Sequence, residues 1–242
     1  MSDPQPAEQA APAPVSRLAM SPRVRAALFI GIALALATRF YQLGERPLHH
    51  DESIHAFQSY TLAKDGSWRY DPAYHGPFLY YANALVYKIA GVTNTTARFL
   101  PAVFGLILLG FAYPLSRWIG RRAAIVYAGL VLISPHIAYF SRFIREDLYS
   151  LVFTFGTILA FRYFLETDRA RWLTVSAVFF AFAGVTKENA YMTGVLFVAF
   201  GVWTFIERAF LAKPREGAAG RTVSATVSWV RRHFMEILTA GL

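Results

Sequence analysis

Long apolar blocks separated by short polar gaps limit what this chain can fold into more than any other feature. The blocks lie at residues 25–41, 99–118, 123–141, 148–165, 172–185 and 190–206. A membrane-spanning helix needs about 20 mostly apolar residues. Hydrophobic residues make up 55% of the chain and charged residues only 16%, against about 25% in soluble domains. The pattern predicts an all-α polytopic membrane protein with about six transmembrane helices.

The basic residues are concentrated in alternate gaps. The formal net charge is +9, and the gaps hold Arg117, Arg121 and Arg122 and then Arg169 and Arg171. By the positive-inside rule these gaps are cytoplasmic, which predicts a multi-pass plasma-membrane protein with its N-terminus inside the cell. The charge therefore needs no nucleic-acid partner, and no nucleic-acid-binding motif accompanies it. With no cysteine in the chain, thiolate metal sites and cysteine nucleophiles are excluded.

Three parts of the chain follow from this topology. Residues 1–22 are rich in Ala, Pro and Gln and predict a disordered cytoplasmic leader. Residues 23–206 form the transmembrane domain, and residues 207–242 form a basic cytoplasmic tail that leads toward a further span. The alternative for the first block is a cleaved signal peptide. In either case residues 42–97 form one long extracytoplasmic loop.

The long loop is expected to be structured rather than a tether. Apolar side chains recur at roughly helical spacing over residues 53–64 and again over residues 77–90, where several are aromatic. Tyr side chains favour the headgroup level of a membrane. We therefore expect two surface helices within this loop.

The polar residues outside the membrane start with a His-His-Asp-Glu run in the long loop. Asp51 and Glu52 are the candidate catalytic residues, with one carboxylate acting as a general base on an acceptor hydroxyl. The alternative is that Asp51 caps the helix that follows. Asp51 and His55 share a helix face, so they can bind a divalent cation together. His50, His55 and His75 are candidate substrate-binding residues; His75 alternatively caps a turn.

The second outside loop, residues 142–147, and the third, residues 186–189, add further charged residues. Asp51, Glu146 and Asp147 are a candidate site for a divalent cation, Mg or Mn, because hard cations prefer oxygen ligands. Alternatively Arg142 and Arg145 hold a phosphate without a metal, or the charges only anchor the helix at the interface. Lys187 is a candidate contact to a lipid phosphate. Its alternative is a snorkelling lysine beside Glu188.

Several of these residues fall in motifs that resemble the GT-C membrane glycosyltransferases. The motifs, in chain order, are Arg39-Phe40, Pro47-Leu48-His49-His50-Asp51-Glu52, Ala97-Arg98-Phe99-Leu100-Pro101, Ser134-Pro135-His136, Ser141-Arg142-Phe143-Ile144-Arg145-Glu146-Asp147 and Thr186-Lys187-Glu188. Within that superfamily the chain is most similar to the protein O-mannosyltransferase-like branch, glycosyltransferase family 39. With His75-Gly76-Pro77, it is most similar to a prokaryotic group of flippase-associated proteins of archaeal-type N-glycosylation. The resemblance covers roughly residues 25–206.

The resemblance implies a transferase that uses a polyprenyl-phosphate sugar donor at an outward-facing site. Asp51 would be the catalytic carboxylate, Glu146 and Asp147 would form the second acidic motif, and Lys187 would lie near the donor phosphate. Members of the superfamily usually continue through several more spans. Because the chain ends at Leu242, we expect it to be the front half of a larger enzyme.

Two functions of different classes remain open on the sequence. The first is a glycosyltransferase that moves a sugar by a single displacement to an unknown protein or glycan acceptor. The second is a non-enzymatic carrier of a lipid-linked glycan, or a flippase-associated protein, that binds the same ligand without turnover. A transporter of ions or small solutes is a third reading, but no inverted repeat supports it.

Overall fold

The computed structural model describes residues 22–69 and 71–206, and within them it contains helices and no strand. The predictions of a leader and of a basic tail fall almost entirely outside these residues. The elements are α1 Pro22–Phe40, α2 His50–Asp65, the 3-10 turn η1 Pro72–Tyr74, α3 Phe78–Ala90, α4 Asn94–Ala97, α5 Phe99–Gly110, α6 Ala112–Ile133, α7 Pro135–Phe140, α8 Glu146–Thr167, α9 Ala170–Gly184 and α10 Asn189–Ile206.

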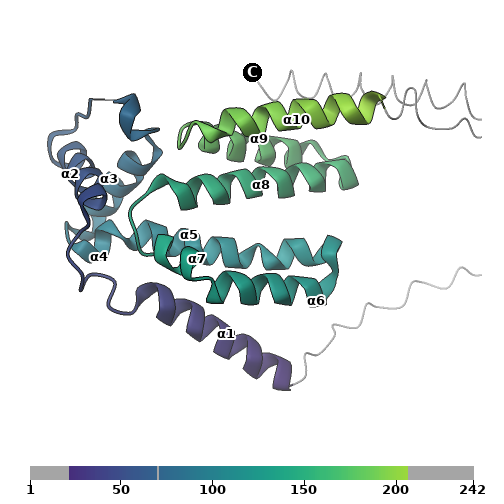
Figure 1. Cartoon of the computed structure of the whole chain (residues 1–242), viewed down its shortest axis with the longest axis horizontal. Coiled ribbons are helices and arrows are strands. Elements are labelled where there is room, and N and C mark those ends of the chain that lie inside the picture. Colours follow the sequence, from purple (N-terminus) through teal and green to yellow (C-terminus); the bar gives the residue numbers. More distant parts are fainter. Residues whose placement is uncertain (1–21, 70, 207–242) are drawn as a thin grey trace, which may run out of the picture.

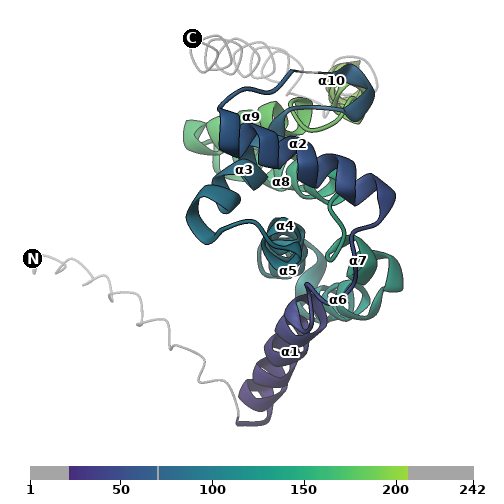
Figure 2. The same ribbon diagram turned by 90° about the vertical axis from the view of Figure 1, so that its left-hand side faces the viewer.

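The long helices run along one axis of the molecule, and α2, α3 and α4 gather at one end of them (Figure 1). The same end is seen face-on in Figure 2, where α2 lies across the ends of the long helices. The connections before α8 and between α9 and α10 reach this end as well. The basic gaps at 117–122 and 169–171 lie at the other end. All three predicted outside loops therefore share one end of the bundle.

The predicted blocks at 99–118 and 123–141 are each assembled from two helical pieces. The first consists of α5 and the start of α6, and the second of the rest of α6 and α7. Gly120 separates them, because its φ of 81° breaks the helix and reverses the chain. Ser134 then accepts a hydrogen bond from the backbone of Ile137, and Pro135 starts α7.

The all-α membrane class predicted from the sequence is confirmed, but the count of six spans is not. Within the described residues, two stretches are long and apolar enough to cross a membrane, Asn94–Ile133 and Glu146–Thr167. The remaining apolar helices at Ala170–Gly184 and Asn189–Trp203 are shorter.

The two surface helices are present with slightly different starts. Helix α2 begins at His50, three residues before the predicted start, and His49 caps it by accepting a hydrogen bond from the backbone of Asp51. Glu52 completes a capping box by accepting from the backbone N–H of His49. Asp51 is therefore not the cap, and its carboxylate takes no part in the capping. Helix α3 follows Pro77 directly, and Gly91 lies just beyond its end.

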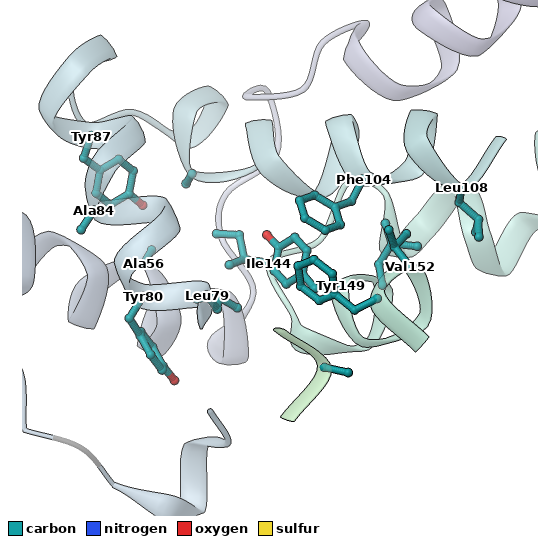
Figure 3. Close-up of a cluster of buried hydrophobic side chains, with 14 of the residues drawn as sticks. Ala56, Leu79, Tyr80, Ala84, Tyr87, Phe104, Leu108, Ile144, Tyr149 and Val152 are labelled. Carbon is teal, nitrogen blue, oxygen red and sulfur yellow. The ribbon is translucent and has the colours of Figure 1, made fainter. Parts of the chain in front are cut away.

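An aromatic core joins the surface helices to the bundle (Figure 3). The ring of Phe78 on α3 meets Phe104 on α5 and Tyr149 on α8 edge-on, with centroids 5.9 and 5.5 Å away. Edge-to-face pairs contribute about 0.5–1.5 kcal/mol each beyond the buried area. The core lies directly beneath the loops that carry the predicted site, so it fixes the loops relative to the helices.

Arg39 connects α1 to the same bundle. Its side chain is fully buried and donates to the hydroxyl of Thr38 and to the backbone carbonyl of Val131 on α6. These two bonds offset part of the cost of burying a guanidinium, whereas its Nε has no hydrogen-bond partner among the described residues. Arg39 therefore holds α1 against α6 and serves the scaffold.

Candidate active site

A buried ion pair fixes the first loop against the start of α5. Arg98, 2% exposed, donates from Nε and Nη2 to the two oxygens of Glu52, at 2.8 and 2.7 Å. The same guanidinium donates to the backbone carbonyls of Leu43, Arg46 and Pro47. A two-pronged guanidinium–carboxylate contact is among the strongest pairs available to a protein.

Glu52 is satisfied from every side. Besides Arg98, its oxygens accept from the backbone N–H groups of His49 and Ile144. Burial by itself raises the pKa of Glu52, but the bonds from Arg98 and these two N–H groups, together with the Arg98 charge, outweigh it and lower the pKa. Glu52 is not among the residues that line the cavity described below. Asp51, which precedes Glu52 in the chain, and Arg145, which follows Ile144, do line that cavity.

The first loop also docks on the third. The backbone N–H groups of Gly76 and Phe78 donate to the carbonyls of Thr186 and Val185, each at 3.1 Å. A Cβ at Gly76 would lie 2.1 Å from the Val185 oxygen, so only glycine permits this approach. His75 holds a left-handed conformation, with φ 64°, and its Nδ1 lies 2.8 Å from Glu188. The His-Gly-Pro run is therefore a docking turn.

A cavity of about 160 Å³ lies between α2, the turn at η1 and the start of α8. It is lined by Asp51, Ile54, His55, Ala73, Tyr74, His75, Arg145 and Glu146. Five of these are candidate site residues from the sequence, and they come from two separate loops. The side chain of Asp51 is 42% exposed, so it faces both the cavity and the solvent.

A row of alternating charges, which we call the rim, runs from Asp51 and Arg145 in the cavity lining to Asp147 and Lys187 beyond it. Arg145 lies 3.7 Å from Asp51 and 3.3 Å from Asp147. Lys187, from the third loop, makes an ion pair with Asp147. Two cations and two carboxylates therefore balance at the rim, and both cations remain partly exposed to solvent.

His55 and Glu146 are the buried charged or titratable residues of the cavity lining, and we call them its floor. Nδ1 of His55 lies 2.9 Å from the hydroxyl of Tyr80 and 3.6 Å from Glu146. Burial, the charge of Arg145 and, to a smaller extent, His75 lower the pKa of His55 to about 4, despite the opposing charge of Asp51. His55 is therefore neutral at pH 7. Burial also raises the pKa of Tyr80 above its ordinary value.

The remaining candidates are not at the cavity. His50 is exposed on the first turn of α2 and is absent from the lining. Arg142 donates to the backbone carbonyls of Thr38 and Gln42, so it holds the end of α1. Neither is placed to contact a ligand in the cavity together with Asp51.

The side chains predicted to bind Mg or Mn do not fit such a site as they lie. In the part of the chain that the structure describes, no three His, Asp or Glu side chains are placed to hold a metal ion. Asp51 and Asp147 face Arg145, and Asp147 also faces Lys187. Protein cations thus already pair with two of the three carboxylates that were predicted to bind a divalent ion.

Arg98 and Tyr74 were not among the residues that the sequence singled out as candidates. Arg98 falls within one of the motifs that carry the family resemblance, and its burial explains why the motif contains it. Tyr74 immediately precedes His75, but nothing in its sequence context distinguishes it from the other tyrosines of the loop.

The arrangement belongs to the GT-C class of membrane glycosyltransferase folds. Two crystal structures of ArnT from Cupriavidus metallidurans match the chain at 19% identity: the apo state with a TM-score of 0.67, and the complex with undecaprenyl phosphate with a TM-score of 0.62. The matches cover 86% and 85% of this chain but only 40% and 41% of ArnT. The chain thus spans about two fifths of those proteins.

A family comparison places the chain more narrowly. Residues 74–229, more than half of the chain, match the model of the dolichyl-phosphate-mannose-protein mannosyltransferase family. The chain therefore belongs to that family. A search of curated protein sequences gave no significant match.

Proposed function

We propose that the protein is a membrane glycosyltransferase that transfers a sugar from a polyprenyl-phosphate donor to an acceptor hydroxyl or amide. The observation that carries the proposal is the row of ion pairs that links Asp51, Arg145 and Lys187, from three loops, beside a small polar cavity that the first two residues line. Family membership and the ArnT complex with undecaprenyl phosphate support this choice of donor.

Asp51 is the residue to which we assign the role of general base. It is 42% exposed, so an acceptor can reach it, and the guanidinium of Arg145 lies 3.7 Å away. A proton taken by this carboxylate from an acceptor O–H or N–H leaves an electron pair on the acceptor. That pair forms the new bond to the sugar as the bond to phosphate breaks.

Lys187 and Arg145 are assigned to the departing phosphate. Negative charge builds on the phosphate oxygens as the sugar leaves, and ammonium and guanidinium groups stabilise such charge. Both cations are paired with Asp147 and remain partly exposed, so a phosphate can approach them without first being buried. Asp147 then serves to hold the two cations side by side.

The membrane orientation in this proposal follows the charge. The basic gaps that hold Arg117 to Arg122 lie at the end of the bundle opposite the cavity. By the positive-inside rule that end is cytoplasmic, so the cavity opens on the extracytoplasmic face. The proposal specifies the donor and the acceptor by chemical class: a sugar linked to polyprenyl phosphate, and a hydroxyl or amide group.

The test is Asp51→Asn, with Asp65→Asn on the same helix as its matched control. Loss of a general base lowers transfer by about 10²–10⁴-fold, whereas Asp65 is exposed at the far end of α2 and its change leaves transfer unaltered. The measurement is transfer or hydrolysis of radiolabelled polyprenyl-phosphate sugars by protein reconstituted in vesicles. Binding without turnover that is insensitive to Asp51 would instead indicate a carrier of the lipid-linked glycan.

A further inference from the structure

Glu146 is a buried carboxyl that the proposed mechanism does not use. Its side chain is 1% exposed, and neither oxygen has a hydrogen-bond partner among the described residues. An unpaired buried polar group is costly, and in natural proteins it usually marks a place where water, an ion or a ligand binds. Glu146 is also one of the residues that line the 160 Å³ cavity.

The cations around Glu146 are engaged elsewhere within the described part of the chain. Arg145 faces Asp51 and Asp147, and Lys187 faces Asp147. His55 lies 3.6 Å away but, by the burial noted above, is neutral at pH 7. The partner that the carboxyl lacks is therefore to be supplied by a molecule in the cavity.

The cavity suits a single sugar ring. Its volume corresponds to roughly five water molecules, which is too small for a disaccharide. Tyr74 contributes an aromatic ring, whose electron-rich face packs well against C–H groups. Asp51, Glu146 and Arg145 contribute acceptors and donors for hydroxyls, and Arg145 is shared with the rim where we place the phosphate.

We propose that this cavity binds the sugar of the lipid-linked donor and that Glu146 contacts one ring hydroxyl, which makes it a specificity-determining residue. The inference rests on the proposed function for the identity of the donor. A carboxyl oxygen accepts a hydrogen bond from a hydroxyl, so a ring with a hydroxyl at the contacted position is selected over one without it. The sugar thus satisfies the group that the protein leaves unpaired.

The experiment measures binding rather than turnover, with the chain purified in detergent and carrying Asp51→Asn to prevent reaction. The probes are polyprenyl-phosphate glucose, its monodeoxy analogues and polyprenyl phosphate without sugar. Glu146→Leu is the test variant, and Glu146→Gln, which keeps the shape and a hydrogen-bonding pair, is its matched control. Thermal unfolding of both variants confirms that they fold.

We expect Glu146→Leu to weaken binding of the full sugar lipid by about 10- to 100-fold. The loss disappears for one deoxy analogue, which wild-type protein already binds weakly, and Glu146→Gln loses less than tenfold. Binding of polyprenyl phosphate without sugar is unchanged. Equal losses on every deoxy analogue, or an equal loss on the lipid without sugar, would overturn the inference.

Failure of the proposed function is separable from failure of this inference. If Asp51→Asn protein transfers sugar as fast as wild type, the assigned base is wrong, yet the deoxy series still reports whether Glu146 contacts a hydroxyl. If no sugar lipid binds more tightly than polyprenyl phosphate itself, the cavity is not a sugar site and the inference fails.

Discussion

Two acidic pairs, Asp51-Glu52 and Glu146-Asp147, each place one member in the cavity lining, and their buried members differ in how they are satisfied. Each pair has one carboxylate that is partly exposed and one that is buried. Glu52 is bonded by Arg98 and by two backbone N–H groups. Glu146, buried to the same extent, has no hydrogen-bond partner in the described residues. The sequence presents the two pairs as equivalents, but the structure does not.

The difference distinguishes a carboxylate that stabilises the fold from one that is available to contact a ligand. A buried carboxylate with every oxygen satisfied contributes to a fixed geometry, because any movement would break several bonds at once. A buried carboxylate whose oxygens have no hydrogen-bond partner lowers the stability of the fold. We expect such a group to be kept only where it contributes to binding a ligand. On this comparison Glu52 holds Asp51 and Arg145 in place, whereas we propose that Glu146 contacts a group of the substrate.

Removing Arg98 gives the largest expected effect, because it turns Glu52 into an unpaired buried charge. Arg98→Met should lower the free energy of unfolding by about 3–5 kcal/mol. The matched control is the double variant Glu52→Leu/Arg98→Met, which removes both charges and should recover part of the loss. Unfolding by a denaturing detergent, followed by circular dichroism, measures both. A single variant as stable as wild type would show that the pair is not the scaffold we describe.

The position of Arg98 also shows what the sequence could and could not predict. The apolar blocks, the two surface helices and the sharing of one end by three loops all follow from hydropathy and charge. Glu52 was nevertheless a candidate catalytic residue, because it is adjacent to Asp51. Successive helical residues point about 100° apart, so adjacency does not reveal that Glu52 faces a residue 46 positions away.

Other differences have the same physical origin. Arg142 is a plausible phosphate ligand by type, but its partners are two backbone carbonyls, which sequence patterns do not mark. Lys187 was weighed as a partner of its neighbour Glu188. In the structure it pairs with Asp147, and Glu188 meets His75. Long-range pairing of charges depends on how loops pack, and that is set by contacts such as the close approach at Gly76.

His55 tests the floor of the cavity through pH, with an effect of up to about 3 kcal/mol. Its pKa is about 4 in the folded chain and about 6.5 when unfolded. Between these values the unfolded state binds a proton at His55 that the folded state does not, so the contribution of His55 to the free energy of unfolding falls as pH decreases from 6.5 to 4. Glu52, whose pKa is lowered from 4.5, loses its contribution only at lower pH.

The comparison of wild type with His55→Asn isolates this contribution. The variant lacks the titrating imidazole but keeps a polar group near Tyr80, so its stability should vary less between pH 6.5 and 4. Thermal unfolding at several pH values in one detergent measures the difference. Parallel curves for the two proteins would mean that His55 titrates normally and that the floor of the cavity is open to water.

Glu146→Leu has the smallest expected effect on stability and, unlike the loss of Arg98, an effect of opposite sign. Removing an unsatisfied buried carboxyl recovers about 1–3 kcal/mol, from which about 0.3–1 kcal/mol is lost because Glu146 favours the positive end of α8. The variant should therefore be about 1–2 kcal/mol more stable than wild type while it binds sugar lipid less tightly. Glu52→Leu, its matched counterpart in the other acidic pair, should be destabilised. If both variants lose stability, Glu146 has an unrecognised structural partner and the contrast between the two pairs is wrong. If Glu146→Leu gains stability and loses sugar binding, the unpaired carboxyl lowers the stability of the fold and contributes to ligand binding.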